Sequence, residues 1–143
     1  MIIGIGTDLC DIGRIERALE RHGERFARRI LVDSEMERFH RHRKPAAYLA
    51  KRFAAKEAFS KALGTGIRFP VNWHGVWVEN GRSGRPSLRF SEPLAALLER
   101  RGVAAVHVSI SDEIGMACAF VVVEGRARTQ EQGPHSSNGD ATK

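Results

Sequence analysis

The sequence predicts one α+β domain in which an antiparallel sheet packs against a long central helix. A chain of 143 residues that is 42% hydrophobic is long enough to bury the core of one such domain. Segments with strand-like alternation and segments with helical spacing follow in the order strand, helices, two strands, helix, two strands, which is typical of the α+β class. Turn-forming residues at 80–86 and 112–115 separate neighbouring strands and indicate antiparallel hairpins.

The central helix is expected over residues 45–64. Pro45 suits the first helical position, because its missing N–H would have no intrahelical partner, and Gly64 suits the left-handed conformation that closes a helix. Glu57 and Lys61 are four residues apart and share one face, among alanines that let a backbone or a ligand come close. On spacing alone, the favoured interpretation of this pair is a surface ion pair worth about 0.3 kcal/mol.

Residues 1–9 predict the first strand. Gly4, Gly6 and Asp8 lie on the same face, and two glycines beside a carboxylate indicate that another element packs closely there. The alternative interpretation of Asp8 is a cap for the helix that follows.

Residues 11–31 predict one two-faced helix. An apolar stripe occupies one side. A row of five arginines lies on nearly the opposite side and contains no acidic residue. This row is either a solvated face or a docking surface. The row consists of Arg14, Arg17, Arg21, Arg25 and Arg28.

The remaining expected elements complete the α+β order. A polar strand face is expected at residues 107–111, and residues 1–124 form the domain, with a disordered tail over 125–143. The elements are a short helix after a capping box of Ser34 and Glu37, strands over 71–79 and 87–90, a helix capped by Ser91, and strands over 103–111 and 116–123.

The net charge of +6 is placed unevenly along the chain. Residues 1–72 carry 15 Lys and Arg against 9 Asp and Glu, whereas residues 73–143 carry 8 against 8. The excess indicates an anionic partner: a nucleic acid, a phosphorylated small molecule or an acidic protein. No run of about 18 apolar residues and no signal peptide is present, and two cysteines form no disulfide or metal framework, which favours a cytoplasmic protein without a membrane segment.

Two motifs resemble those of a known family. Residues 53–61, FAAKEAFSK, fill every fixed position of [WF]-x-x-K-E-[AS]-x-x-K, and residues 4–16, GIGTDLCDIGRIE, resemble its G-[IVT]-D motif, with Thr7 before the aspartate. Together with HVSISD at residues 107–112, they resemble the 4′-phosphopantetheinyl transferases over residues 2–124, in particular the short, single-domain type that makes holo acyl carrier protein.

This resemblance implies an activity. Such enzymes move the 4′-phosphopantetheine arm of coenzyme A to a serine of apo acyl carrier protein, in fatty acid biosynthesis, and release adenosine 3′,5′-bisphosphate. The family match assigns Mg²⁺ to Asp8 and Glu57 and places Lys61 at the leaving phosphate. Either Glu57 or a metal-bound water is expected to take the serine proton. A homotrimer with sites between protomers is implied as well.

The resemblance also implies binding residues. Arg52, Lys61 and the segment Gly64-Thr65-Gly66 are expected to hold coenzyme A phosphates, with Pro86 and His107 near the nucleotide. Two other classes stay open: a nucleic-acid-binding module, which the lack of zinc, helix-turn-helix and RNP-like patterns disfavours, and a non-catalytic carrier-protein binder. The residues expected to dock the carrier protein are Arg14, Arg21, Arg25 and Arg28.

Overall fold

The computed structural model describes residues 1–127, so the predicted tail over 125–143 falls almost wholly outside the described residues. Its last strand ends at Gly125, one residue beyond the predicted domain boundary. Within residues 1–127, no helix combines the length and the apolar character needed to cross a membrane.

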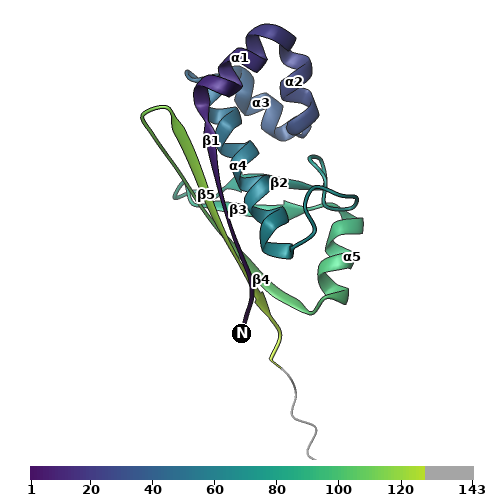
Figure 1. Ribbon diagram of the computed structural model, residues 1–143. Coiled ribbons are helices and arrows are strands. Elements are labelled where there is room, and N and C mark those ends of the chain that lie inside the picture. Colours follow the sequence, from purple (N-terminus) through teal and green to yellow (C-terminus); the bar gives the residue numbers. More distant parts are fainter. Residues whose placement is uncertain (128–143) are drawn as a thin grey trace, which may run out of the picture.

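A three-stranded antiparallel sheet and one long helix form the centre of the molecule (Figure 1). The strands are β1 (Ile2–Asp11), β4 (Val103–Glu113) and β5 (Met116–Gly125), in the spatial order β1-β5-β4. Helix α4 (Pro45–Leu63) packs on one face of this sheet, which confirms the predicted α+β class.

Smaller elements surround this centre. A second sheet pairs two short strands, and the other helices lie at the two ends of α4 (Figure 1). They are α1 (Ile12–His22), α2 (Glu24–Ile30), α3 (Asp33–Arg41), β2 (Val76–Asn80), β3 (Pro86–Phe90) and α5 (Glu92–Arg100).

The core lies between α4 and the sheet. Helix α4 contributes Leu49 and Phe59, and β5 contributes Val121 and Val123; all four side chains are fully buried. Because α4 is covered by other elements on most of its sides, its alanines are buried as well, and the helix has no wide polar face.

Strand β1 approaches α4 through its glycines. A Cβ atom added at Gly4 would lie 2.0 Å from the carbonyl oxygen of Ala62, and one added at Gly6 would lie 2.0 Å from that of Ala58. The predicted close packing is therefore confirmed: only glycine lets the two backbones lie at this distance.

The helix expected over residues 11–31 is wrong as a single element. Gly23, at a φ of 64°, ends α1 and precedes α2, so the chain turns between them. The five arginines are divided accordingly, with Arg14 on α1 and Arg28 on α2. Asp11 caps α1, accepting a hydrogen bond from the Arg14 N–H at 3.3 Å, so Asp8 is not the cap.

The predicted capping box of Ser34 and Glu37 is also wrong. Helix α3 begins two residues earlier than expected, and it is Glu35 that reaches back, with Oε1 accepting from the N–H of Val32 at 3.1 Å. The strand expected over 71–79 is shorter, because residues 71–75 form turns before β2.

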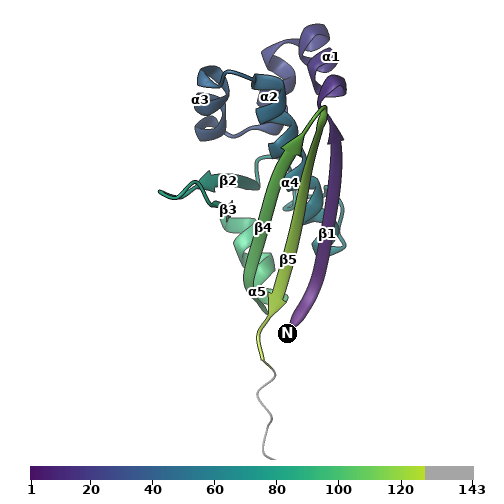
Figure 2. The same ribbon diagram turned by 90° about the vertical axis from the view of Figure 1, so that its left-hand side faces the viewer.

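The second face of the three-stranded sheet is exposed; it is apolar along β1 and part of β5, and polar along β4, where His107, Ser109 and Ser111 are exposed as predicted. Figure 2 shows this face toward the viewer, with α4 and α5 behind it and α1, α2 and α3 beyond its upper end. Ile5 and Leu9 of β1 are 61% and 66% exposed, although both lie within a strand of the central sheet. Other large exposed apolar residues here are Ile3, Met116 and Phe120. A face of this kind indicates a partner surface.

We predict that Gly6→Ala destabilises the protein by about 1–3 kcal/mol, because the added Cβ must push β1 away from α4. Chemical denaturation measures this difference. The control is Gly81→Ala, where the nearest atom would lie 3.7 Å away, at the Arg85 carbonyl, and the change should stay within about 0.5 kcal/mol. Equal stability of the two variants would contradict the close approach.

Candidate active site

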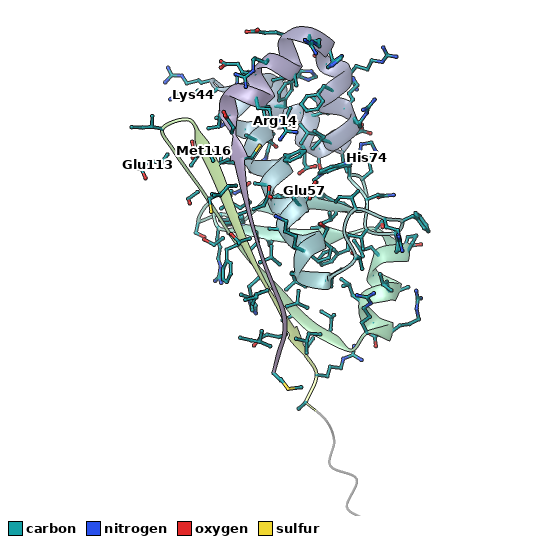
Figure 3. All side chains as sticks on the ribbon, viewed as in Figure 1. Arg14, Lys44, Glu57, His74, Glu113 and Met116 are labelled. Atoms are coloured by element: carbon teal, nitrogen blue, oxygen red, sulfur yellow. The ribbon has the colours of Figure 1, made fainter. Side chains whose placement is uncertain are left out.

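Asp8, Glu57 and Lys61 meet where β1 crosses α4. The Lys61 ammonium lies 3.0 Å from Asp8 Oδ1 and 3.1 Å from the carbonyl oxygen of Thr7. Figure 3 shows Glu57 on α4 beside β1. The glycines of β1 bring these groups together, because they set the distance between strand and helix. The predicted shared face of Glu57 and Lys61 is thus turned toward Asp8.

The two carboxylates lie close together in a partly buried site, so ionising both is unfavourable. Burial, and then the negative charge of Asp8, raise the pKa of Glu57 above its ordinary value, while Lys61 partly opposes the shift. Asp8 is only 13% exposed at its side chain, and within residues 1–127 its Oδ2 has no hydrogen-bond partner. A buried carboxylate oxygen without a partner is costly unless a cation binds it.

This donor set fits Mg²⁺. Within the described part of the chain, no three His, Cys, Asp or Glu side chains come together in a way that could hold a metal ion. Mg²⁺ does not require such a cage, since it is usually held by one or two carboxylates together with waters and substrate phosphates. Asp8 and Glu57 would provide that pair, and the partnerless Asp8 Oδ2 is the atom best placed to serve as a ligand.

A second, basic cluster surrounds Arg52. Its Nη2 donates to Asn80 Oδ1 at 2.7 Å, and its guanidinium lies 4.3 Å from the centre of the Tyr48 ring. The guanidinium is thereby fixed and faces a cavity of about 550 Å³. The lining residues are Arg38, Arg41, His42, Tyr48, Lys51, Arg52, Asn80 and Gly84. Such a concentration of cations favours a phosphate ligand.

The sequence did not indicate Arg38, Tyr48 or Asn80 as members of this cluster. Arg38 Nη1 also donates to Asn80 Oδ1, at 3.2 Å, so one amide oxygen joins α3, α4 and the end of β2. The contact spans 42 residues of sequence. The basic run before Pro45 was the only local signal of a phosphate site in this region.

The structure does not bring the two clusters together within one chain. Asp8 lies on β1, one edge of the sheet, whereas His107 lies on β4, the other edge. Arg52 and Glu57 are five residues apart on α4, which separates them by about 140° around the helix axis. Lys51, beside Arg52 on α4, forms an ion pair of 3.4 Å with Asp112 of β4, so this basic side of α4 faces β4.

Pro86 lies beside the basic cluster, whereas His107 lies on β4, at the sheet edge opposite Asp8. Pro86 begins β3 and pairs with Asn80, whose side chain contacts Arg52. His107 points to the exposed face of the sheet, where its Nε2 lies 2.7 Å from Glu124 Oε2. The hydrogen bond from His107 lowers the pKa of Glu124 below its ordinary value.

In the segment Gly64-Thr65-Gly66, which is expected to hold phosphates, two of the three backbone N–H groups are already engaged. Gly64 is left-handed, with a φ of 73°, and closes α4 as predicted. Its N–H donates to the Lys61 carbonyl, and the N–H of Thr65 donates to that of Ser60. These two N–H groups complete the helix end, so they are not free for a phosphate.

A third feature is a groove of about 250 Å³ beside the carboxylates. Arg14 lies at this groove, with Phe53 of α4 and Phe26 of α2 among its walls. Cys10, also in the lining, is adjacent to the carboxylate site: burial, and then Asp8, raise the pKa of its thiol to about 11. The groove was not predicted, because its aromatic residues read as part of the apolar stripe.

A family model described as the 4′-phosphopantetheinyl transferase superfamily matches residues 4–119. The chain therefore belongs to this superfamily, as its motifs predicted. Within it, the chain is 55% identical over 124 residues to a holo-[acyl-carrier-protein] synthase of Nitrosomonas europaea, covering 87% of this chain and 99% of that protein.

Solved structures agree with this assignment. The crystal structure of holo-[acyl-carrier-protein] synthase from Neisseria meningitidis has a TM-score of 0.84 and 45% identity, covering 87% of this chain and 99% of that one. A Bacillus anthracis holo-(acyl-carrier-protein) synthase in complex with CoA (3′,5′-ADP) has a TM-score of 0.74 and 37% identity, covering 88% and 99%.

The raised pKa of Glu57 predicts a pH dependence of stability. The folded protein holds the Glu57 proton more tightly than the unfolded chain does, so ionisation lowers stability as pH rises through this window. The penalty is complete above the folded pKa and absent below the unfolded value of about 4.3. Without divalent cations, Glu57→Gln should therefore unfold at a higher temperature than wild type near neutral pH, with the gap narrowing toward pH 4.

Thermal unfolding at one fixed protein concentration measures this. Glu37→Gln, at an exposed position of α3, controls for the loss of a surface carboxylate. A Glu57→Gln variant that is less stable than wild type at neutral pH would contradict the electrostatic account.

Proposed function

We propose that this protein transfers the 4′-phosphopantetheine arm of coenzyme A to a serine of apo acyl carrier protein, giving holo acyl carrier protein and adenosine 3′,5′-bisphosphate. The observation that carries the proposal is the convergence of Asp8, Glu57 and Lys61 at the crossing of β1 and α4. Support also comes from relatives named holo-[acyl-carrier-protein] synthase and from a neighbour solved with CoA.

The reaction is a displacement at phosphorus. The serine oxygen bonds to the phosphorus that carries pantetheine, the bond to the bridging oxygen breaks, and the serine proton is lost. Such reactions depend mainly on positioning and on stabilising charge on the phosphate oxygens. Asp8 and Glu57 would hold Mg²⁺, which would supply positive charge that neutralises those oxygens. Lys61 neutralises the leaving phosphate, and either Glu57 or a water held at the site takes the serine proton.

Coenzyme A is held by two groups of residues in this proposal. Lys61 and the segment Gly64-Thr65-Gly66 bind the pyrophosphate, the latter through groups other than the two engaged N–H groups. Arg52 binds a phosphate of the nucleotide in the basic cavity, with Pro86 and His107 beside the nucleoside. The three-way hydrogen bonding at Asn80 supports this role, because it fixes Arg52 before a ligand arrives.

We propose a homotrimer in which each site lies between two chains. Asp8 on β1 and His107 on β4 lie at opposite edges of the sheet, and Arg52 and Glu57 point about 140° apart on α4, so a neighbour would supply one of the two groups. The exposed apolar face between those edges, with Ile5, Leu9 and Phe120, provides the surface for such an assembly. A head-to-tail contact that closes after three copies satisfies both requirements.

The carrier protein is proposed to dock on the arginines of α1 and α2 beside the apolar groove. Arg14 lines the groove next to the carboxylate site, so a partner there would reach Glu57. A phosphopantetheine acceptor that is acidic would be steered by these charges. The residues are Arg14, Arg21, Arg25 and Arg28. A cytoplasmic location stays a prediction.

The experiment that tests the function is intact-mass measurement. Purified protein, Mg²⁺, coenzyme A and apo acyl carrier protein should give a carrier with one added phosphopantetheine, and a carrier whose acceptor serine is replaced by alanine should gain no mass. An unmodified wild-type carrier would favour a non-catalytic carrier-protein binder, and retained DNA binding at high salt would favour a nucleic-acid module.

Sites shared between chains predict complementation. Glu57→Gln and Arg52→Gln should each be nearly inactive at limiting coenzyme A. When the two are unfolded together and reassembled, about one site in four should combine an intact Glu57 with an intact Arg52. Activity should then exceed that of either variant treated alone. A mixture no more active than its components would show that each chain forms a complete site.

Charge steering predicts a salt-dependent effect on the carrier protein. Arg14→Glu together with Arg21→Glu should raise the KM for carrier and leave the KM for coenzyme A nearly unchanged. The difference should shrink with salt, since the Debye length falls from about 10 Å at 0.1 M to about 3 Å at 1 M. Arg100→Glu, on the distant α5, is the control. If the double variant has the same KM for carrier as wild type at low salt, the arginines form only a solvated face.

A further inference from the structure

A buried ion pair lies behind the proposed catalytic residues. The ammonium of Lys56 is 2.7 Å from Glu35 Oε1, and the two side chains are 0% and 1% exposed. Lys56 also donates to the carbonyl oxygens of Ile30, at 2.6 Å, and Trp73, at 2.7 Å. All three ammonium hydrogens are therefore used, and each bond goes to a different segment of the chain.

The Glu35 carboxylate is satisfied in the same way. Besides Lys56, its oxygens accept from the N–H of Val32 and the N–H of Val78, each at 3.1 Å. The pair therefore joins α4 to the end of α2, the start of α3 and strand β2. Each charge also lies at the helix end that suits it: the ammonium at the C-terminal carbonyl of α2, and the carboxylate at the first turn of α3.

Helix α2 depends on these polar contacts for its place. It is a short helix, and only Ala27 and Ile30 are buried. Its C-terminal carbonyls are bound by two side chains from elsewhere, Lys56 at Ile30 and His74, whose Nε2 lies 2.7 Å from the Arg28 oxygen. His74 is exposed and lies close to α2 (Figure 3). Apolar packing alone gives α2 little to fix its position along α4.

The same contacts reach the docking groove. Lys56 precedes Glu57 on α4, so the anchor of α2 and the proposed catalytic carboxylate are adjacent in sequence and point in different directions from one helix. Trp73, whose carbonyl Lys56 holds, stacks on Phe53 with 5.0 Å between ring centres, and Phe53 lines the groove. The pair thus determines both α2 and one wall of the groove relative to Glu57.

We propose that the Lys56–Glu35 pair is a positioning device for carrier-protein recognition. It holds the α2 part of the docking surface, with Arg25 and Arg28, at the distance from Glu57 that lets the acceptor serine reach the reaction site. This inference rests on the proposed docking of the carrier at α1 and α2. It assigns the pair an effect on the KM for carrier, while coenzyme A binding and the transfer step stay unchanged.

An experiment can distinguish a positioning role from a purely structural one. Neutral side chains of similar size give nearly the same net stability as a buried ion pair, so the protein should stay folded when both charges are removed. The test variant replaces both charges, Glu35→Gln with Lys56→Met, so that no lone charge is left buried. The KM for apo carrier should rise about 10-fold. The KM for coenzyme A and kcat at saturating carrier should stay within about twofold of wild type. Hydrogen exchange should quicken in α2 and not in β5.

A second variant avoids the core altogether. His74→Ala removes the exposed contact to the Arg28 carbonyl, leaves the core untouched, and should raise the KM for carrier in the same direction by a smaller factor. If a folded double variant and His74→Ala both show the wild-type KM for carrier, the inference is overturned. If the double variant does not fold, the outcome with His74→Ala decides alone.

The docking surface itself needs a separate control. Arg25→Glu with Arg28→Glu alters the charges of α2 and leaves its anchors in place. A raised KM for carrier in this control, with an unchanged KM in the two anchor variants, would refute the positioning role and keep the docking proposal. An unchanged KM in the control would refute docking at α2, and the positioning role with it. If the wild-type protein itself transfers no phosphopantetheine, the proposed function is contradicted instead.

Discussion

The contact between β1 and α4 is the constraint on which the rest of the structure depends. Gly4 and Gly6 let the strand lie against the carbonyl oxygens of the helix, at a distance where any Cβ would collide. The next residue on the same face of the strand is Asp8, which is thereby brought to Lys61 and Glu57. One packing requirement therefore joins two motifs that lie far apart in the sequence, and the reacting groups inherit the rigidity of strand and helix.

This arrangement trades stability for binding. The raised pKa of Glu57 and the lack of a hydrogen-bond partner for one Asp8 oxygen describe a site that is electrostatically unsatisfied within residues 1–127. Such costs are typical of functional sites, since a cation or substrate relieves them on binding. The exposed apolar part of the outer sheet face is a second unsatisfied surface. Arg52 and Glu57 lie apart within one chain. A neighbouring chain would cover the apolar surface and bring its Arg52 to the carboxylate site.

Local patterns predicted the fold class, and the resemblance of two motifs to a known family predicted that Asp8 and Glu57 belong to one site. Strand alternation, the helix limits at Pro45 and Gly64, and two motifs with fixed spacing were sufficient. Features that depend on tertiary contacts were missed. The break at Gly23 gave no signal beyond one glycine in a helical pattern, and the bond of Asn80 to two arginines joins residues up to 42 apart. Glu35 was overlooked because its partner, Lys56, is remote in sequence.

The central claim is that Asp8 and Glu57 form a carboxylate pair built to hold Mg²⁺ for phosphopantetheine transfer. The most direct measurement is the transfer rate as a function of Mg²⁺ concentration for wild type and for Asp8→Asn, with circular dichroism to show that both are folded. We expect wild type to be inactive in chelator and Asp8→Asn to be about 100-fold slower at the same Mg²⁺ concentration, with partial recovery as Mg²⁺ is raised. A wild-type rate in Asp8→Asn, or undiminished transfer in chelator, would contradict the account.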